Sequence, residues 1–402
     1  MPPRDLDRIF DELVSGRITS RRDFLQRLGA AGLLVTGGST FLAACGGIEG
    51  EGQNTDPAAT PEAVDHAEVD FDQLNFANWP LYIDKKVLRD FEKEYGAKVK
   101  YTEEINDNEE FFGKIRQPLS DGRDIGRDIV VFTDPVAARM VRLGFVQALD
   151  KKNIPNAENL VDTLRSPQWD PERSYSMPWQ SGMTIIGYNK SKVGREITSW
   201  NDLFDPEFKG RVSLFSDARE VVNLMLFREG KSPADATIDD ILAAIEMADE
   251  ENRKGQIRRF TGNDYTGDLT KGNLWICQAY SGDLIQLQAD NPDIAYVIPE
   301  EGATIWTDNM QVPSTSENQY AAETMIDYVY DPAVAATIAA WVNYVSPVKG
   351  AREEMLESDP DLAENELIFP PDEVLAKLHQ YVEVDEDEER QMNEAMQAVV
   401  GA

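Results

Sequence analysis

The alternation that decides the fold is clearest in residues 128–144, DIVVFTDPVAARMVRLG. After its opening aspartate, the segment 128–132 is apolar throughout, which is typical of a strand buried on both faces of a parallel sheet. A short helical pattern follows over 135–143, and Gly144 is placed to end it. A buried strand joined directly to a helix indicates an α/β fold.

The same alternation precedes this stretch. A strand pattern at 74–77 and another at 99–101 enclose a helix at 84–95, and a further helix is expected at about 108–116. The helix at 84–95 carries its apolar side chains on one face and has Gly96 as its stop. These elements and the segment 128–144 form one α/β unit.

A second unit begins after Ser176. We expect its strands at 184–188, 211–215, 273–279 and 294–298, and its helices at 200–204, 218–228, 237–251 and 282–289. From Asp308 the pattern returns to a strand at 310–312, followed by long alanine-rich helices over 318–344. The acidic run 385–390 is interpreted as a solvated helix face. The chain without its N-terminal segment is too long for one small core and suits two lobes.

The N-terminal segment is predicted to be an export signal and not part of the fold. Residues 1–27 carry six arginines, and the paired Arg21-Arg22 precede an uncharged stretch over 28–44. The pair followed by Phe-Leu resembles the twin-arginine signal. The alternative is a transmembrane anchor, but four glycines within 28–44 make a poor membrane helix.

The segment Leu42-Ala43-Ala44-Cys45 resembles the lipobox of bacterial lipoproteins, so we expect residues 1–44 to be removed and Cys45 to carry lipid. Residues 45–71 would then be a solvated tether, with His66 exposed within it. Lipidation of Cys45 leaves Cys277 as a single thiol, and its apolar surroundings predict a small core residue.

The charge is extreme. The chain has a formal net charge of −34, and residues 1–44 hold six basic and five acidic side chains, so the remainder carries −35. Such a surface repels nucleic acid and anionic lipid, which argues against both as partners. It suits either a cationic ligand or life in concentrated salt, and the bulk charge does not separate the two.

Over about 72–380 the chain resembles the spermidine/putrescine-binding proteins of ABC importers. The resemblance is carried by Asn78-Trp79-Pro80-Leu81-Tyr82, Trp200-Asn201-Asp202-Leu203, Pro206-Glu207-Phe208-Lys209-Gly210, Asp217-Ala218-Arg219-Glu220, Ile298-Pro299-Glu300-Glu301-Gly302, Trp306-Thr307-Asp308 and Asn343-Tyr344-Val345-Ser346-Pro347. The series as a whole, in order and at family spacing, is specific.

The resemblance implies a two-lobed fold like that of type II periplasmic binding proteins, with ligand in a cleft between the lobes. Lobe 1 would comprise 72–182 and 307–352, and lobe 2 would comprise 183–306 and 353–402. It also implies an extracytoplasmic monomer that binds a polyamine, needs no cofactor and delivers its ligand to a membrane permease. The ligand-binding residues it implies are Trp79, Tyr82, Asp217, Glu220, Tyr280, Asp283, Trp306, Asp308 and Tyr344.

The residue types suit that ligand. A polyamine at neutral pH is a flexible cation, so it needs carboxylates for its ammonium groups and aromatic faces along its methylenes. The chain pairs the two kinds at Trp79 with Tyr82, Tyr280 with Asp283, and Trp306 with Asp308.

Plainer explanations compete at two of these positions. Trp79 follows a strand and is equally typical of a core residue. Asp217-x-x-Glu220 before an apolar helix is typical of a capping box, although a capping carboxylate can also face a ligand.

Two departures from the family thin the aromatic walls: Thr133-Asp134-Pro135 stands where an aromatic residue is common, and Gln278 where some members have tryptophan. The chain has no His-Glu-x-x-His, no Gly-x-Ser-x-Gly and no cysteine pair, which disfavours an exported enzyme. A binding protein of the same fold for another small solute, such as an amino acid or a metal complex, stays open.

Overall fold

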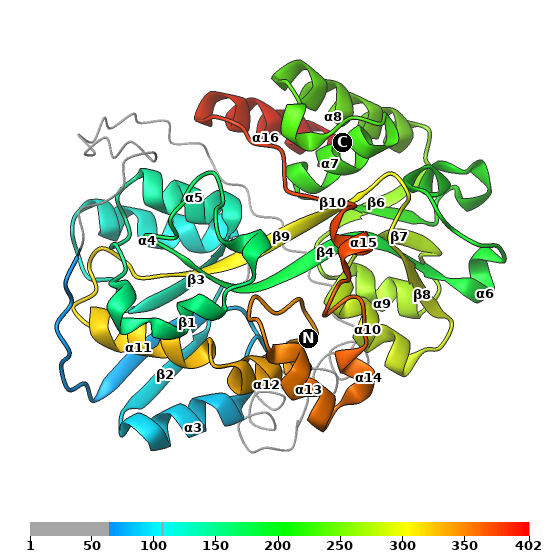
Figure 1. The fold of residues 1–402 in the computed structure, drawn as a ribbon. Helices are drawn as coiled ribbons and strands as arrows, with labels where there is room; N and C mark the ends of the chain where they lie inside the picture. The colour runs from blue at the N-terminus through cyan, green and yellow to red at the C-terminus, as the bar shows by residue number, and fades with distance from the viewer. Residues whose placement is uncertain (1–63, 106–107, 402) are drawn as a thin grey trace, which may run out of the picture. The chain divides into compact units, whose positions relative to one another are not determined.

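A computed structural model describes residues 64–105 and 108–401 (Figure 1). The predicted export signal, Cys45 and most of the predicted tether lie outside the described residues. Within the described ranges, no helix combines the length and apolarity needed to cross a membrane.

The chain forms two compact units. Unit 1 holds the described residues up to Trp179, together with Asp308–Val342 and Pro347–Ser358. Unit 2 holds Gln180–Thr307, Asn343–Ser346 and the described residues from Asp359 onward.

The predicted lobes differ from these units in two longer segments, and by one to three residues at 180–182 and Thr307, which were expected in lobe 1 but belong to unit 2. Residues 343–346 were expected in lobe 1 but belong to unit 2, because Val345 pairs with Ser181 and the Tyr344 ring packs against Gly282. Residues 353–358 were expected in lobe 2 but belong to unit 1, because their helix packs on the preceding alanine-rich helix.

Unit 1 is a sheet with helices around it. Its strands are β1 (Gln73–Asn78), β2 (Lys98–Glu103), β3 (Ile129–Thr133) and part of β9 (Ala303–Gln311), in the order β2-β1-β3-β9. The helices are α3 (Lys85–Tyr95), α4 (Asn108–Ser120), α5 (Asp134–Arg142), α11 (Gln319–Val329), α12 (Pro332–Val342) and α13 (Ala351–Ser358), with 3-10 turns at Lys151–Asn153, Pro155–Asn159 and Asp162–Leu164.

The ends of α3 and the burial of β3 follow from their local sequence. The Asp84 carboxylate accepts from the backbone N–H of Lys86 and caps α3, and Gly96 ends it with φ 72°. Strand β3 is buried as predicted, but its neighbours make a mixed sheet, parallel to β1 and antiparallel to β9. The expectation of an all-parallel environment for this strand was therefore wrong.

Unit 2 contains a second sheet region, in the order β4-β7-β5-β6. Its strands are most of β4 (Met177–Asn189), β5 (Val212–Phe215), β6 (Ile257–Thr261), β7 (Ile276–Tyr280), β8 (Ile294–Val297) and β10 (Leu378–His379), with the first part of β9. Its helices are α6 (Lys190–Val193), α7 (Ala218–Arg228), α8 (Ile238–Arg253), α9 (Tyr265–Thr270), α10 (Ser281–Asp290), α14 (Pro360–Ala363), α15 (Asp372–Leu375) and α16 (Glu386–Val400), with 3-10 turns at Trp200–Phe204, Pro206–Phe208 and Pro233–Asp235.

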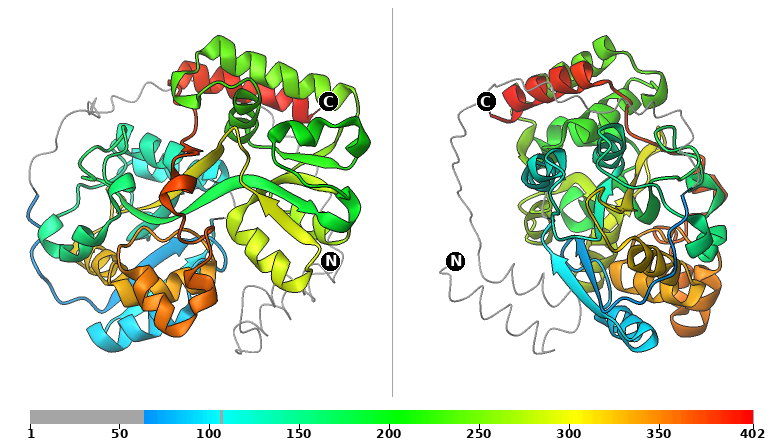
Figure 2. Two further views of the ribbon diagram at one scale, coloured as in Figure 1. Left: turned by 45° about the vertical axis from the view of Figure 1, so that its right-hand side comes forward. Right: turned by 90° about the vertical axis from the view of Figure 1, so that its left-hand side faces the viewer.

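The C-terminal segment completes the core of unit 2. Helix α16 lies along α8 (Figures 1 and 2) and adds Met392, Met396 and Val399 to the buried cluster of that unit. The acidic run 385–390 forms the start of α16, where Asp385 and Glu388 make a capping box. Cys277 is fully buried in the core of unit 2, as predicted.

One strand and one histidine were not predicted correctly from the sequence. Strand β6 was not predicted, because two adjacent arginines interrupt its apolar pattern. Strand β10 holds His379, whose ring contacts Phe227.

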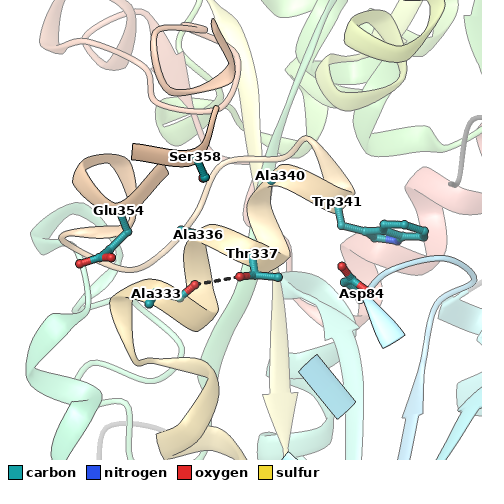
Figure 3. A pocket seen from close by; sticks show the side chains of 8 residues that line it. All are labelled: Asp84, Ala333, Ala336, Thr337, Ala340, Trp341, Glu354 and Ser358. Atoms are coloured by element: carbon teal, nitrogen blue, oxygen red, sulfur yellow. Dashed lines mark hydrogen bonds between the residues drawn. The ribbon is translucent and has the colours of Figure 1, made fainter. Parts of the chain in front are cut away.

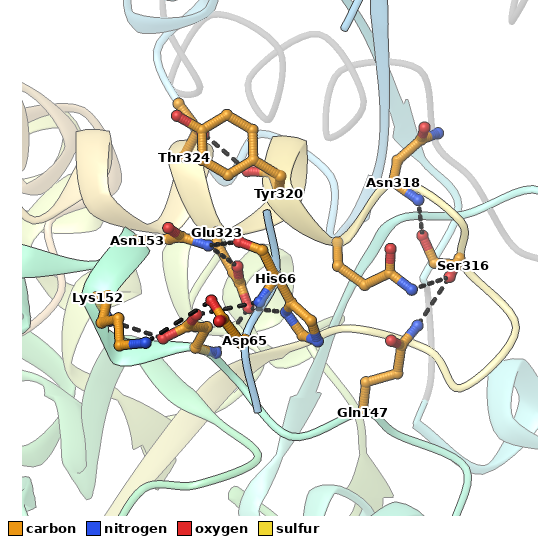
Figure 4. A network of polar contacts seen from close by, with 12 residues as sticks. Asp65, His66, Gln147, Lys152, Asn153, Ser316, Asn318, Tyr320, Glu323 and Thr324 are labelled. Atoms are coloured by element: carbon orange, nitrogen blue, oxygen red, sulfur yellow. Dashed lines mark hydrogen bonds and ion pairs between the residues drawn. The ribbon is translucent and has the colours of Figure 1, made fainter. Parts of the chain in front are cut away.

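The histidine that was not predicted correctly is His66, which lies near the end of the predicted tether and was expected to be exposed. Its ring Nδ1 lies 2.6 Å from a carboxylate oxygen of the buried Glu323. Its backbone N–H donates to Asp150, and its carbonyl accepts from Asn153 (Figure 4). His66 is therefore held on unit 1 and not solvated.

Candidate functional site

In unit 1 one predicted ligand residue, Tyr82, contacts another, Asp308. The antiparallel pairing of β9 with β3 places Asp308 opposite Thr133. The Thr133 hydroxyl donates to Oδ1 over 2.7 Å, and the Tyr82 hydroxyl donates to Oδ2 over 2.8 Å. Both carboxylate oxygens of a side chain that is only 5% exposed are thus satisfied.

Burial raises the pKa of Asp308 to about 6, and the negative charge of Asp134 adds to the rise. The hydroxyls of Thr133 and Tyr82 oppose it, because hydrogen bonds to the charged form favour that form. At neutral pH this carboxyl is therefore mostly ionised, in a setting where its charge is poorly solvated.

One tryptophan contacts Tyr82, and another predicted ligand residue, Trp79, packs against the core of the same unit. The edge of Tyr82 meets Trp179, with ring centroids 6.3 Å apart. Trp79 is half-buried and packs against the core of unit 1, while its Nε1 is buried without a hydrogen-bond partner among the described residues. Trp79 thus fits the core explanation and still has an unused donor.

The departure at Thr133 has a structural role. Its hydroxyl accepts from Asn108 Nδ2 over 2.9 Å and donates to Asp308, and its backbone N–H donates to Asn108 Oδ1. A hydroxyl that holds the Asp308 carboxylate thus stands where an aromatic residue was expected. The sequence contained Thr133 but no pattern that linked it to Asp308.

In unit 2 the central acid is Glu220, in the first turn of α7. Asp217 caps this helix by accepting from the backbone N–H groups of Arg219 and Glu220. The Glu220 carboxylate does not return to the Asp217 backbone, so the predicted capping box is wrong in that half. Its Oε1 instead accepts from the hydroxyls of Tyr381, at 2.7 Å, and Thr184, at 2.9 Å.

The other oxygen of Glu220 is bare. Oε2 is buried and has no hydrogen-bond partner in the part of the chain that the structure describes, and the residue is 1% exposed. Burial raises the pKa of Glu220 to about 8, with a further rise from the charge of Asp217, while Tyr381 and Thr184 lower it. The empty protein therefore keeps Glu220 largely protonated at pH 7.

Gln278 holds the backbone of Glu220 in place. Its Oε1 accepts from the backbone N–H of Phe215, and its Nε2 donates to the backbone carbonyl of Glu220. The side chain thereby ties the end of β5 to the first turn of α7. This is why a fully buried glutamine stands where some family members have tryptophan.

A row of aromatic rings lies beside Glu220 in the same unit. Phe215 stacks on Tyr280 at 4.4 Å between centroids, Tyr280 meets Trp306 edge-on at 5.6 Å, and Trp306 meets Tyr344 at 5.3 Å. Glu220 lies close to this row, because Gln278 joins its backbone carbonyl to the backbone N–H of Phe215.

Two glycines make room for the row. A Cβ atom on Gly182 would overlap the six-membered ring of Trp306, and one on Gly282 would lie 2.6 Å from the Tyr344 ring. Neither contact is possible for a larger residue without moving the ring. The indole Nε1 of Trp306 is buried and has no hydrogen-bond partner among the described residues.

Asp283 joins the row through a tyrosine that the sequence did not reveal. The Tyr265 hydroxyl donates to Asp283 Oδ2 over 2.9 Å and accepts from the backbone N–H of Tyr280. Asp283 is in the first turn of α10 and is 5% exposed. Tyr280 and Asp283 therefore lie together, as their spacing predicted.

The predicted residues thus form two groups. Trp79, Tyr82 and Asp308 lie in unit 1, and Asp217, Glu220, Tyr280, Asp283, Trp306 and Tyr344 lie in unit 2. Thr133, Thr184, Tyr265 and Tyr381 were missed because single hydroxyl residues far apart in sequence carry no motif. Their contacts depend on strand register and on the returning C-terminal segment.

A surface cavity elsewhere in unit 1 contains none of these residues. It has a volume of about 420 Å³ and is lined by Asp84, Ala333, Ala336, Thr337, Ala340, Trp341, Glu354 and Ser358 (Figure 3). The Asp84 carboxylate there is engaged as the cap of α3. In the described ranges, no group of three or more histidine, cysteine or acidic side chains lies together as a metal site.

Carboxylates beside aromatic rings on two α/β units are the features of a solute-binding protein. The model of the bacterial extracellular solute-binding protein family matches residues 86–369, and the chain belongs to this family.

Within this family, the chain is similar to proteins whose names refer to spermidine and putrescine. The spermidine/putrescine-binding periplasmic protein of Escherichia coli K12 is 30% identical over 313 residues, which cover 77% of this chain and 86% of the relative. A putrescine-binding periplasmic protein of the same organism is 30% identical over 325 residues, 76% of this chain and 85% of the relative. The structure of a putative spermidine/putrescine ABC transporter from Listeria monocytogenes matches with a TM-score of 0.72 at 28% identity, over 82% of this chain and 98% of that one.

These comparisons confirm the predicted resemblance and the two-lobed solute-binding fold. The family is one of binding proteins and not of enzymes. The ligand roles of the individual residues stay predictions.

Proposed function

We propose that this protein is the extracytoplasmic component of an ABC importer and that it captures polyamines such as putrescine and spermidine. The observation that carries the proposal is Glu220, a fully buried carboxyl with one oxygen bare beside a row of aromatic rings. The spermidine/putrescine-binding periplasmic protein of Escherichia coli K12 is a relative of this chain, and its name supports the same ligand class here.

An ammonium group complements the Glu220 carboxyl in hydrogen bonding and in charge. It supplies N–H donors to the bare Oε2 and a positive charge that favours the ionised form, so the proton held by the empty site would leave on binding. The faces of Tyr280 and Trp306 attract an ammonium by about 0.5–2 kcal/mol each. Methylenes of the ligand would lie against the remaining ring surface.

The second ammonium group is assigned to Asp308. A diamine held by one carboxylate from each unit would contact both units at once, and closure of the units on the ligand would exclude water. Small-angle scattering with and without spermidine tests this step, with a smaller radius of gyration expected in the bound state. An unchanged radius at saturating spermidine would count against closure.

Partners and location follow from the same role. We propose delivery to a membrane permease by a monomer tethered through lipid on Cys45, with the docked His66 marking where the tether meets unit 1. Mass spectrometry of the mature N-terminus tests the anchor. An unmodified Cys45, or retention of residues 1–44, would remove it from the proposal.

A thermal-shift screen tests the ligand class, because a compound that binds only the folded state raises the melting temperature. We expect putrescine and spermidine to raise it, and amino acids and ferric chelates to leave it unchanged. N-acetylputrescine is the matched control, since it keeps the chain length but has one ammonium. A larger shift with an amino acid or a chelate than with either polyamine would overturn the assignment.

A further inference from the structure

Arg173 in unit 1 combines a buried charge with an unfavourable backbone. Its side chain is 4% exposed, and its φ of 52° lies in the left-handed region that residues other than glycine and asparagine rarely adopt. A position of that geometry would be filled more easily by glycine or asparagine. The arginine is therefore present for its side chain.

The guanidinium is held on three sides. Nε donates to the carbonyl of Leu164 over 2.9 Å, and one terminal nitrogen donates to the Ser176 hydroxyl and to Asn309 Oδ1. The ring of Trp169 lies 5.6 Å from the guanidinium carbon. These contacts hold the charge against β9 at Asn309, the residue that follows Asp308 in the chain.

Asn309 links the Arg173 guanidinium to a second acid, Asp134, by two hydrogen bonds. Its Oδ1 accepts from Arg173 over 2.8 Å, and its Nδ2 donates to Asp134 Oδ1 over 2.9 Å. A guanidinium only donates and a carboxylate only accepts, so the amide has a single orientation that satisfies both. Asn309 is fully buried and immediately follows Asp308 on the strand.

We propose that Arg173 is a positioning residue for Asp308: it offsets the negative charge of Asp134 and, through Asn309, fixes the strand position from which Asp308 meets its ligand. The inference rests on the proposed function, because it assigns Arg173 a part in binding the ammonium group at Asp308.

The electrostatic argument depends on which charges face one another. Asp134 and Asp308 are both acids, and the charge of Asp134 disfavours ionisation of Asp308. Asp134 also attracts Arg173, and it is the largest favourable charge on the buried guanidinium. Removing the guanidinium charge would take one compensating positive charge away from Asp134, so Asp308 would ionise less readily and bind an ammonium more weakly.

The groups that face Asp308 come from three other elements. They are Tyr82 after β1, Thr133 at the end of β3 and Asp134 at the start of α5, with Arg173 reaching Asp134 by way of Asn309. Glu220 titrates in unit 2 and affects any binding profile. Each variant is therefore compared with the wild type at the same pH, which cancels the contribution of Glu220.

The test is calorimetric titration of the full protein with putrescine at pH 5.5 to 8 for Arg173→Gln and Arg173→Lys. Glutamine keeps donors but not the charge, and lysine keeps the charge but not the fork. Putrescine affinity should fall at acid pH as Asp308 takes up a proton, and we call this fall the acid limb. We expect Arg173→Gln to shift the acid limb to a pH about one unit higher, so that binding below it is about tenfold weaker than in the wild type. Arg173→Lys should move it much less.

Rescue separates positioning from support of the fold. Asp134→Asn in the Arg173→Gln background removes the negative charge that Arg173 no longer offsets, while its amide oxygen still accepts from Asn309. It should restore the acid limb to within about 0.3 pH units of the wild type, whereas a purely structural defect would persist. If Arg173→Gln does not fold, Asp134→Asn alone provides the test, since it should move the acid limb below that of the wild type.

The outcomes are distinguishable. A wild-type protein that binds no polyamine overturns the proposed function, and the inference with it. A wild type that binds, with an Arg173→Gln profile that is unchanged or not rescued by Asp134→Asn, overturns the role of Arg173 alone. An acid limb that is not moved downward in the Asp134→Asn single variant has the same consequence.

Discussion

Asp308 in unit 1 and Glu220 in unit 2 are built from the same parts with one difference. Each is a buried carboxyl that accepts hydrogen bonds from one tyrosine and one threonine hydroxyl. In Asp308 the two hydroxyls occupy different oxygens, whereas in Glu220 both meet Oε1 and leave Oε2 bare.

The difference explains how the two acids hold their protons. Distributing donors over both oxygens stabilises the charged form of Asp308, and its pKa rises only to about 6. The bare oxygen of Glu220 gains no such help, and its pKa rises to about 8. We infer that Asp308 is charged before an ammonium ligand arrives, while Glu220 becomes charged because the ligand arrives.

The largest effect is expected at the preformed charge. Asp308→Asn keeps the volume but removes the charge, and such a change at a buried charge pair typically costs about 2–5 kcal/mol of binding. The empty protein should not lose stability, because its ionised form at pH 7 is disfavoured by burial. Calorimetric titration with putrescine beside melting curves measures both, with the exposed acid variant Asp70→Asn as control. Wild-type affinity in Asp308→Asn would show that this acid does not contact the ligand.

Glu220→Gln should cost less binding at pH 7, about 1–3 kcal/mol, because the wild type first spends about 1.4 kcal/mol per pKa unit to release its proton. The loss should grow toward pH 9, where the wild-type acid is already ionised. Titration in buffers of different ionisation enthalpy should show proton release for the wild type and less for the variant. Equal proton release from both proteins would contradict the comparison.

The same acid sets a pH dependence of the empty protein. The folded pKa of Glu220 lies above its ordinary value, so its contribution to stability is complete below about pH 4.5 and is lost as the pH rises through about 8. The Glu220→Gln variant lacks this loss, and its melting temperature should fall less between pH 6 and pH 9. A parallel fall in the two proteins would show that the burial of Glu220 does not control its proton.

Sequence reasoning reached the acids but not their surroundings. Asp217, Glu220 and Asp308 were identified because they fall in contiguous motifs of a known family. Thr133, Thr184 and Tyr381 were not, because each meets its acid only through tertiary pairing: β3 with β9, β4 with α7, and the segment after β10 with α7. Whether Glu220 closes a capping box was undecidable locally, since Asp217 alone already caps the helix.

The division of the chain into two units was predicted less well than its helices and strands, because that division depends on tertiary pairing. The helix at 84–95 and the strand at 128–132 lie within one residue of α3 and β3, because caps and apolar runs are local. The division of residues 343–346 depends on the pairing of Val345 with Ser181, which no local pattern encodes.

The aromatic row offers an intermediate effect on the unit 2 site alone. Gly182→Ala would push the Trp306 ring out of place, and overpacking of this kind typically costs about 1–3 kcal/mol. We expect a lower melting temperature and weaker putrescine binding. Gly262→Ala is the matched control, since a Cβ there meets nothing within 4 Å. A Gly182→Ala protein that binds normally would remove Trp306 from the site.

The smallest effect is expected at Asp217, whose carboxylate is exposed and serves as the cap of α7. Loss of such a cap costs about 0.5–2 kcal/mol of stability, so Asp217→Ala should melt a few degrees lower. Its effect on affinity should be small, because two consequences oppose each other: the ligand loses a distant screened charge, while Glu220 loses a neighbour that disfavours its ionisation. Asp217→Asn separates them, since asparagine caps as well as aspartate but carries no charge. It should melt like the wild type and release slightly less proton on binding, because Glu220 is then more often ionised beforehand. If Asp217→Asn instead melts as low as Asp217→Ala, the carboxylate stabilises α7 through its charge and not through its hydrogen bonds.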